Sequence, residues 1–547
     1  MTKNLKKYYL TTPLYYVNSK PHIGHSYTEI AADVLARFHR LIGEDVLFLT
    51  GTDEHGQKIE RAARDAGMTP QEFTDKVSLA FRDLWKVLNI KYDDFIRTTE
   101  PRHKKAVEMV WRKLVEKKLI YPHTYDGWYC TPDEYFFTEG FADGFVEGKA
   151  ICPECKRPAE KIREDNYFFK LSEDREWLIN EIRSGANIKI LPETRQNEVL
   201  GFLENNELQD LCISRPKNRL AWGIPLPAEI SKDHVTYVWF DALINYISAV
   251  GFGADPKKLG KWWPADVHII GKDILRHHAI YWTILLKALD LPLPKMIFAH
   301  GWWVQGGEKM SKSRGNVVDP VEIVKTYGVD AYRYFLLRET PFGADGTFSE
   351  EALILRFNTD LANDLGNLLN RSLTMCEKYF EGEIPKGPPF GAFTYPMLHE
   401  GAEEDPRFTP NPIHSEAQGI CNDINMLFAI INESISRLAF TEALREIWNL
   451  VNRSNKFIES SSPWILAKQQ RSEELRLVIV TLCEALKVLA QAVWPFMPEK
   501  AEALWAQLGL KGKPCDVPFK DNMWGFFKDG GKIAKGAPLF PRIETKK

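Results

Sequence analysis

The sequence predicts an α/β protein with a parallel, doubly wound sheet that is divided by an insertion and followed by a helical domain. Strand-like and helix-like patterns alternate up to about residue 115, as they do in parallel sheets. Short aromatic runs, broken by glycine, proline and charged residues, take over between about 118 and 232. From about residue 350, apolar residues recur at helical spacing, for example at Phe440, Leu444, Ile447 and Val451.

These changes of pattern divide the 547 residues into five segments. A chain of this length is too long for one hydrophobic core, so several domains are expected. We expect a nucleotide-binding, Rossmann-like domain whose halves span 1–117 and 233–305, with an insertion over 118–232. A loop and contact region over 306–365 and a helical domain over 366–547 should follow.

The composition excludes several classes of protein. With 71 basic and 74 acidic side chains, the net charge of −3 rules out a basic coat for nucleic acid over the whole surface, although not a local basic face. No run of about 18 apolar residues occurs, so we expect no membrane span. The N-terminal lysines lead directly into the first predicted strand. We therefore expect no separate targeting segment and a cytoplasmic location.

The first predicted strand and helix meet at an unusual pair of histidines. The aromatic and β-branched stretch Tyr8–Val17 suits a buried strand, and Ser26–Leu41 has the apolar spacing of a helix. His22, Gly24 and His25 lie between them in the sequence HIGH. A helix N-terminus offers backbone N–H groups and the positive end of a dipole, so this junction is a candidate phosphate site. Two capping or packing histidines are the alternative interpretation.

The next predicted strand ends in a second polar cluster. The segment DVLFLTGTDEHG reads as a buried strand followed by Thr52, Asp53, Glu54 and His55. Ligands of doubly wound sheets bind outside the carboxyl ends of the strands. Both polar clusters are therefore placed where a ligand is expected.

A lysine-rich loop is the other unusual stretch. Residues Gly306–Asn316 read GGEKMSKSRGN, in which Lys309 and Lys312 stand among serines, an arginine and three glycines. Glycines at this density favour a mobile loop, whose cations could hold one end of a triphosphate. A solvated run of charges is the alternative.

HIGH at 22–25 and KMSKS at 309–313, in this order within a divided α/β fold, resemble the signature pair of class I aminoacyl-tRNA synthetases. The resemblance covers almost the whole chain. It implies a class I Rossmann-like catalytic domain split by a connective-peptide insertion, followed by an all-α anticodon-binding domain. It also implies ATP with Mg²⁺, and catalysis by positioning and electrostatics. The implied catalytic residues are His22, His25, Lys309 and Lys312, and the implied ATP-binding residues are His22, Gly24, His25, Gly271, Asp273 and Lys312.

The segments VTYVWFDALINYI and IIGKDILRHH are similar to the amino-acid pocket of the methionyl-tRNA synthetase family, which often has proline where this chain has Leu243. Helical spacing places Trp239 and Tyr246 on one side of a turn, for which core packing is the alternative explanation. An aromatic wall suits a polarizable thioether, and Tyr246 and His278 could hydrogen-bond the sulfur. The resemblance implies that Asp53 pairs with the substrate ammonium. The implied methionine-binding residues are Pro13, Leu14, Tyr16, Asp53, Trp239, Ala242, Leu243, Tyr246, Ile274 and His278.

Three of the eight cysteines lie close together in the sequence, which suits a metal site better than a disulfide scaffold. Cys130 and Asp133 stand where a C-x₂-C pair would, and 18 residues separate them from the pair Cys152 and Cys155. Zinc accepts both thiolates and carboxylates, so these four residues are candidates to bind one structural Zn²⁺. Members of the family have one zinc knuckle, two or none, and the alternative here is a knuckle that has lost its metal.

Three residues in the helical part match the anticodon-reading positions of the family. Asn367 and Arg371 lie one helical turn apart in NDLGNLLNRS, and Trp464 lies in FIESSSPWILAKQ. In isolation they would be surface polar residues and a core tryptophan. A tryptophan can stack on an unstacked base, and polar side chains can bind base edges. The implied anticodon is CAU, and the implied partner is tRNA(Met), the initiator included.

The resemblance thus implies a methionine–tRNA ligase, which joins L-methionine to ATP as methionyl-adenylate and transfers the methionyl group to the terminal adenosine of tRNA. No further domain is expected after GAPLFPRIE, so we expect a monomer. A small nucleotidyltransferase is one alternative, but it would lack the helical domain. A class I synthetase for cysteine or a branched aliphatic amino acid would change the pocket around Trp239. A tRNA-binding paralogue without catalysis would have lost His22, His25 or Lys312.

Overall fold

The computed structural model describes residues 5–18, 20–132, 134–137, 139–153, 155–305, 308–309, 318–387, 411–519 and 523–544. The chain forms two compact units. The first consists of Met1–Ala32 and Asp45–Trp302, and the second of Asp33–Glu44 and Trp303–Lys547. The boundary between them crosses helix α1 (Ile23–Leu41).

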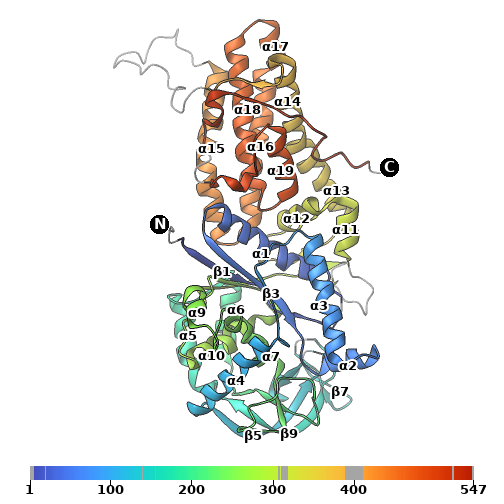
Figure 1. The fold of residues 1–547 in the computed structure, drawn as a ribbon. Coiled ribbons are helices and arrows are strands. Elements are labelled where there is room, and N and C mark those ends of the chain that lie inside the picture. Colours follow the sequence, from blue (N-terminus) through green and yellow to red (C-terminus); the bar gives the residue numbers. More distant parts are fainter. Residues whose placement is uncertain are drawn as a thin grey trace. The chain divides into compact units, whose positions relative to one another are not determined.

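A seven-stranded sheet forms the centre of the first unit (Figure 1). Its strands are β1 (Lys7–Thr11), β2 (Tyr15–Tyr16), β3 (Asp45–Asp53), β4 (Asp94–Arg97), β10 (Lys189–Leu191), β14 (Val267–Gly271) and β15 (Met296–His300). The order is β10-β15-β14-β1-β3-β2, with β4 also paired to β3. Every pairing is parallel, which confirms the predicted parallel sheet.

The order of the strands reverses between β1 and β14. From β1 the chain proceeds to β3 on one side, and from β14 it proceeds to β15 on the other, while Leu10 of β1 pairs with Val267 of β14. Loops that follow the carboxyl ends of two such strands diverge and leave room for a ligand. This edge of the sheet is therefore the expected binding site, and the HIGH segment follows β1 there.

Helices surround the sheet of the first unit (Figure 1). Besides α1 they are α2 (Gln57–Asp65), α3 (Pro70–Val87), α4 (Pro101–Glu116), α5 (Arg175–Ser184), α6 (Glu193–Asn205), α7 (Val238–Leu243), α8 (Asn245–Ser248), α9 (Pro256–Trp262), α10 (Thr283–Ala288) and the π-helix η4 (His277–Trp282). Helix α3 begins with a capping box between Thr69 and Glu72, which satisfies two backbone N–H groups. Helix α9 packs on β1 and α6 on β10, and Trp111 and Trp282 lie fully buried in one shared core.

Two predicted elements differ from the observed ones at their ends. The predicted strand Tyr8–Val17 is broken into β1 and β2, because Pro13 lies between them and proline has no N–H for the sheet. Helix α1 begins at Ile23 rather than Ser26, so His25 lies in its first turn. The two histidines therefore lie closer to the helix N-terminus than the apolar pattern indicates.

The insertion contains an antiparallel sheet of its own. Its strands are β5 (Ile120–Cys130), β6 (Tyr135–Phe137), β9 (Glu160–Phe169) and β11 (Leu211–Cys212), in the order β11-β9-β5-β6. The short pairs are β7 (Phe145–Val146) with β8 (Lys149–Ala150), and β12 (Ser214–Pro216) with β13 (His234–Thr236). The aromatic runs GWYC and DNYFFKL lie at the ends of the long strands β5 and β9. Strand β10 also falls within 118–232 but belongs to the parallel sheet.

The second unit is mainly helical, as predicted. Its helices are α11 (Pro320–Tyr327), α12 (Val329–Arg338), α13 (Glu350–Arg356), the π-helix η6 (Phe357–Gly366), α14 (Asn367–Phe380), α15 (Pro412–Ser436), α16 (Phe440–Ser461), α17 (Pro463–Lys468), α18 (Ser472–Val493) and α19 (Pro498–Gln507). Its short strands are β16 (Trp303–Gln305), β17 (Glu308–Lys309), β18 (Gly346–Thr347), β19 (Glu383–Ile384) and β20 (Gly531–Lys532). Helices α15, α16 and α18 pack on one another (Figure 1), and every residue from 477 to 493 of α18 is buried. Among the described helices, none has the length and apolar character needed to cross a membrane.

A fully buried ion pair holds part of the second unit together. Arg333 of α12 donates from Nη2 to Asp33 Oδ2 at 2.7 Å, and neither side chain is exposed. Arg333 also donates to the backbone carbonyls of Pro495 and Phe496, each at 2.9 Å. Arg37 Nε donates to the same Asp33 oxygen at 2.6 Å. The guanidinium of Arg333 thus satisfies one carboxylate and two carbonyls that water does not reach.

Candidate active site

The two histidines of the HIGH segment hydrogen-bond to the backbone through Nδ1. The N–H of His22 donates to His25 Nδ1 at 3.0 Å, and the N–H of Gly24 donates to His22 Nδ1 at 3.1 Å. A neutral imidazole has one N–H, so in each ring the proton lies on Nε2. The ring centroids are 3.9 Å apart. Two ring N–H donors thus stand side by side at the N-terminus of α1, an arrangement suited to phosphate oxygens.

Two glycines allow close approaches near this edge of the sheet. A Cβ atom on Gly24 would lie 3.0 Å from Cε1 of His22, so a larger residue would displace the ring. A Cβ atom on Gly271, at the end of β14, would lie 2.6 Å from Oδ1 of Asp273. Asp273 accepts from Nε1 of Trp302 at 3.3 Å. Gly271 and Asp273, both predicted to bind ATP, therefore lie together at the end of the strand that neighbours β1.

The predicted lysine loop is only partly within the described residues. The backbone of Lys309 ends β17 and pairs with Val304 of β16. Residues 310–317, which include Lys312, lie outside the described residues, as does the side chain of Lys309.

Asp53 is the last residue of β3, and no ion pair of its carboxyl group is found among the described residues. The residue is 5% exposed, and its Oδ1 has no hydrogen-bond partner among the described residues. Burial, followed by the negative charges of Asp241 and Glu134, raises the pKa of Asp53 well above its usual value, while the backbone N–H of His55 opposes this shift. A cation bound here would relieve both the burial cost and the repulsion.

The three residues after Asp53 are constrained in different ways. Arg97 donates to both carboxylate oxygens of Glu54, at 2.6 and 2.9 Å. His55 Nδ1 lies 2.7 Å from Oδ2 of Asp241. Gly56 has φ of 110°, and a Cβ atom there would lie 2.4 Å from both the Glu134 carboxylate and the Tyr16 hydroxyl. The turn that follows Asp53 is thus fixed at every residue.

The predicted methionine wall contains a hydrogen-bonded pair of side chains. Burial lowers the pKa of His278 to about 4, so the ring is neutral at pH 7, and its Nδ1 donates to the carbonyl of Ile274 at 2.9 Å. Nε2 therefore accepts from the Tyr246 hydroxyl at 2.7 Å. Leu243 and Tyr246 belong to the main core, with Leu14 and Ile274 packed against it. The helix is interrupted at Ile244, so Tyr246 lies on α8 and not on α7.

Trp239 stacks on a neighbour that the sequence did not single out. Its ring lies 3.9 Å from that of His277, with an interplanar angle of 25°. Burial, and then the charge of His278, lowers the pKa of His277 to about 3, so this ring too is neutral. Pro13, in the segment before β2, and Ala242, on α7, are both buried. The π-helix η4 carries both histidines, and such helices are frequent at functional sites.

Other residues around Asp53 escaped the sequence analysis because their partners are far away in the sequence. Glu134 Oε1 accepts from the Tyr16 hydroxyl at 3.0 Å and from the N–H of Lys58 at 2.8 Å. Asp241 binds His55 and His103. In the sequence, Glu134 and Asp241 are each recognisable only as an acidic residue next to aromatic residues. Such a residue does not reveal which side chain it will bind.

Three predicted metal ligands come together. The sulfur atoms of Cys130, Cys152 and Cys155 all lie within 4.8 Å of one another, and those of Cys130 and Cys155 are 3.5 Å apart. Tetrahedral Zn–S bonds of about 2.3 Å place two sulfurs about 3.8 Å apart, so the cluster fits zinc. Cys130 and Cys152 are buried in a small apolar core together with Trp128, Phe137, Ala150 and Ala159. Asp133, the fourth predicted ligand, lies outside the described residues.

The three predicted anticodon residues all lie in the second unit. Asn367 is the exposed first residue of α14, and Arg371 lies one turn later on the same helix. Nη2 of Arg371 lies 2.7 Å from Oε1 of Glu459, near the end of α16. Trp464 follows on α17 and is 45% exposed. A tryptophan with this exposure is not a core residue, and its ring is accessible to a stacking partner.

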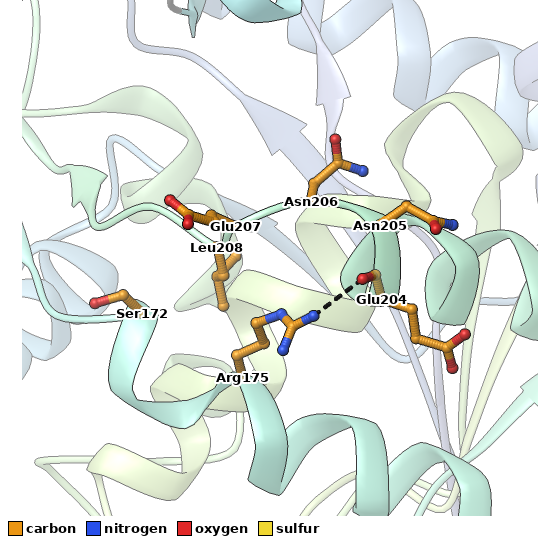
Figure 2. A pocket seen from close by; sticks show the side chains of 7 residues that line it. All are labelled: Ser172, Arg175, Glu204, Asn205, Asn206, Glu207 and Leu208. Atoms are coloured by element: carbon orange, nitrogen blue, oxygen red, sulfur yellow. Dashed lines mark hydrogen bonds between the residues drawn. The ribbon is translucent and has the colours of Figure 1, made fainter.

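Figure 2 shows a hollow of the first unit, with a volume of about 470 Å³. It is lined by Ser172, Arg175, Glu204, Asn205, Asn206, Glu207 and Leu208. Arg175 donates to the carbonyls of Leu203 and Glu204 at 2.7 and 3.2 Å, so it caps the C-terminal end of α6. None of the predicted site residues lines this hollow.

Two known protein families match this chain. Residues 8–163 and 157–373 match the family described as tRNA synthetases class I (M), and residues 417–524 match the anticodon-binding domain of tRNA ligase. The methionine–tRNA ligase of Caldanaerobacter subterraneus subsp. tengcongensis is 47% identical over 99% of this chain and 80% of its own length. That of Bacillus subtilis is 42% identical over 100% of this chain and 79% of its own length.

Solved structures give the same result. The Mycobacterium tuberculosis methionyl-tRNA synthetase, in complex with methionyl-adenylate, is 38% identical to this chain. It superposes with a TM-score of 0.89, over 98% of this chain and 100% of that chain.

Proposed function

This chain belongs to the methionine–tRNA ligase family of class I tRNA synthetases, and on that premise we propose which of its residues carry each step of the reaction. The enzyme activates L-methionine with ATP and transfers the methionyl group to tRNA. The observation that carries the assignment is the buried Asp53 carboxylate, without a counter-charge, in a chain 47% identical to a methionine–tRNA ligase over nearly its full length.

The first step is attack of the methionine carboxylate on the α-phosphate of ATP. A bond forms between a carboxylate oxygen and the α-phosphorus, the bond to the bridging oxygen breaks, and pyrophosphate leaves with the electron pair. His22 and His25 bind phosphate oxygens through Nε2–H, assisted by the N-terminus of α1 and by the Mg²⁺ that accompanies ATP. Gly24, Gly271 and Asp273 position the nucleotide. Lys309 and Lys312 stabilise the charge that develops on pyrophosphate.

The second substrate is held by its ammonium group and by its side chain. Asp53 pairs with the α-ammonium, which supplies the missing counter-charge. The thioether lies against an aromatic and apolar wall, with Tyr246 and His278 near the sulfur. The remaining wall residues are Pro13, Leu14, Tyr16, Trp239, Ala242, Leu243 and Ile274. In the transfer step, a ribose hydroxyl of the terminal adenosine of tRNA(Met) attacks the methionyl carbonyl, and AMP leaves.

The catalytic domain in this proposal comprises 1–117 and 233–305, with the insertion 118–232 between its halves. Residues 306–365 carry the lysine loop and contact the tRNA stem, and residues 366–547 bind the anticodon. A cytoplasmic location and a monomeric state are parts of the same proposal, because they accord with a role in translation.

Amino-acid-dependent exchange between ATP and pyrophosphate, measured with all twenty amino acids, tests the activity. Exchange with methionine alone is expected. Exchange with another amino acid would retain the class I chemistry but overturn the pocket assignment. A folded preparation with Mg²⁺ that exchanges with none would favour the alternative of a tRNA-binding paralogue.

The Lys312→Ala enzyme is expected to form adenylate about 100-fold more slowly while its Kd for methionine stays the same, because the ammonium group acts on charge that appears only in the transition state. Single-turnover rates and equilibrium binding separate the two quantities. Lys325→Ala, an exposed lysine on the nearby helix α11, is the control. Equal losses in rate and methionine affinity would refute the role.

Zinc bound by Cys130, Cys152, Cys155 and Asp133 would brace the insertion, since all four positions are filled by protein. The purified protein is expected to contain about one zinc per chain, and Cys152→Ser should lose it. Elemental analysis by mass spectrometry measures both. Cys212→Ser is the matched control, because Cys212 is a buried cysteine of the same insertion outside the cluster. A wild-type protein without zinc would show that the knuckle binds none.

Trp464→Ala is expected to lower kcat/KM for tRNA(Met) charging about 10- to 100-fold, because base stacking on an aromatic ring is worth about 1–3 kcal/mol. Methionine-dependent ATP–pyrophosphate exchange should not change. Ile465→Ala, at a neighbouring residue with the same 45% exposure, controls for loss of apolar surface. Loss of exchange in the Trp464 variant would argue against an anticodon role.

A further inference from the structure

Asp241 lies between two histidines that come from distant parts of the sequence. His55 Nδ1 lies 2.7 Å from one of its carboxylate oxygens, and His103 Nε2 lies 2.6 Å from the other. His55 follows β3, His103 lies on α4 and Asp241 lies on α7, three elements of the first unit (Figure 1). The His103 and Asp241 side chains are not exposed, and that of His55 is 3% exposed. These side chains form a closed polar network inside the core.

The hydrogen bonds of this network keep Asp241 ionised. Burial on its own would raise the pKa of Asp241, but the charge of His55 and the hydrogen bonds from both histidines hold it below its usual value. A carboxylate can only accept, so each histidine presents an N–H to it. The Ser248 hydroxyl lies 2.9 Å from Nδ1 of His103 and can accept or donate, so it satisfies that nitrogen too.

His55 links the network to the methionine site. Its side chain binds Asp241, and the residue lies in the turn that begins after Asp53, the last residue of β3. Its backbone N–H opposes the rise in the pKa of Asp53 that burial causes. Its backbone carbonyl accepts from the Tyr16 hydroxyl at 2.9 Å. Glu54, the residue between Asp53 and His55, is held independently by Arg97. An imidazole fixed by Asp241 therefore fixes the turn that follows Asp53.

Asp241 also acts on Asp53 through its charge. The ionisable groups that face Asp53 are Asp241 from α7, Glu134 from the segment after β5, the adjacent Glu54, and Tyr16 from β2. Asp241 is the largest of these charges in its effect on Asp53. Like charges oppose ionisation, so the negative charge of Asp241 disfavours the ionised form of Asp53. The position of Asp241, by contrast, helps to orient Asp53 through His55.

We propose that His103, Asp241 and His55 form a positioning network for the Asp53 carboxylate. This inference rests on the proposed role of Asp53 in binding the methionine ammonium. His55 and His103 bind the two carboxylate oxygens of Asp241, and the fixed ring of His55 holds the turn that follows Asp53. The three side chains contact one another, and they act as positioning residues. They determine the KM for the amino acid and leave both the phosphate chemistry and the choice of side chain unchanged.

Kinetics of methionine-dependent ATP–pyrophosphate exchange test this network. Asp241→Asn, His55→Leu and His103→Leu should each raise the KM for methionine about tenfold or more, with kcat and the KM for ATP within about threefold of wild type. The preference for methionine over norleucine should be unchanged. His234→Gln is the control, because His234 is a hydrogen-bonded histidine of the same unit outside the network. Unchanged KM values in all three variants would overturn the proposal.

Conservative variants show whether the loss of methionine affinity comes from the lost hydrogen bonds or from misfolding. An asparagine amide can replace the Nδ1–H of His55, and a glutamine amide can replace the Nε2–H of His103. His55→Asn and His103→Gln should therefore recover most of the methionine affinity that the leucine variants lose. Conservative variants that are as weak as the leucine variants would overturn the hydrogen-bonding role.

The pH profile distinguishes this role from a merely structural one. Asp241→Asn removes a negative charge that faces Asp53, so the acid limb of kcat/KM for methionine should move about one pH unit lower. His103→Leu leaves the Asp241 carboxylate in place and should not move the limb downward. A raised KM in Asp241→Asn with an unmoved limb would indicate general damage to the fold and overturn the proposal.

Asp53→Asn separates this proposal from the one on which it rests. If Asp53→Asn keeps the wild-type KM, the ammonium assignment itself fails. If Asp53→Asn loses methionine while Asp241→Asn resembles wild type, only the network fails.

Discussion

Asp53→Asn is expected to lower kcat/KM for methionine about a thousandfold, because it leaves the substrate ammonium without a counter-charge in a buried site. Asparagine has nearly the same shape as aspartate, so the variant removes little besides the charge. Steady-state ATP–pyrophosphate exchange at saturating ATP measures the effect. The KM for ATP should change little, since the histidines of the HIGH segment are untouched.

A matched control for this variant is available on the same strand. Asp45 begins β3 and pairs with Lys261 at the surface, at 2.7 Å. Asp45→Asn removes one carboxylate charge from the opposite end of the strand and should leave methionine kinetics unchanged. A loss of less than about tenfold in Asp53→Asn would mean that another group binds the ammonium.

The pH dependence provides a second readout for Asp53. Burial, together with the charges of Asp241 and Glu134, raises its pKa, so the folded enzyme holds a proton over a range in which the unfolded chain has lost it. Methionine affinity should therefore increase as the pH rises through this raised pKa, and Asp53→Asn should abolish that increase. Over the same range the unliganded enzyme should lose stability as the pH rises, and bound methionine should restore it.

Arg333→Met is expected to destabilise the helical unit by about 3–5 kcal/mol, because it leaves Asp33 partly uncompensated in a site that excludes water. The variant also leaves the carbonyls of Pro495 and Phe496 without a donor. Arg37 would still pair with Asp33. Denaturant unfolding, followed by a probe in the second unit, measures the loss, since a chain of two units need not unfold in one step.

Two further variants show whether the stranded charge is the cause. Arg437→Met removes an exposed arginine that pairs with Glu442, and it should cost less than about 1 kcal/mol. Asp33→Asn combined with Arg333→Met should cost less than Arg333→Met alone, since no carboxylate is left without its partner. A double variant as unstable as the sum of the single variants would show that packing, and not charge, dominates.

The parts of the fold that depend on local pattern could be predicted from the sequence. The parallel sheet and the helical unit follow from the spacing of apolar residues, and both polar clusters lie at strand ends as expected. The division between α7 and α8 at Ile244, by contrast, is not marked by any change in the spacing of apolar residues. The same is true of the π-helix η4, which brings His277 against Trp239.

The candidate site was predictable where the type of a residue and its local position are enough to indicate its chemistry. This is the case for the carboxylate at the end of a strand, for the paired histidines at a helix N-terminus and for the cysteine cluster. The network around Asp241 does not, because 138 residues separate Asp241 from His103 and 186 separate it from His55. Nothing local in the sequence indicates such a pairing. The same holds for Glu134, whose hydrogen bond with Tyr16 joins the insertion to the proposed methionine site.

The short helix α7 carries residues with two different proposed roles, and an engineering experiment should vary these residues separately. Trp239, Ala242 and Leu243 belong to the proposed methionine wall, and Asp241 among them holds the two histidines. A combinatorial library that randomises 239–243 as a block, in search of enzymes that accept methionine analogues, would also discard Asp241 in most clones. Such clones would bind every amino acid poorly, whatever its side chain. A library that keeps Asp241 and varies its neighbours would sample substrate preference alone.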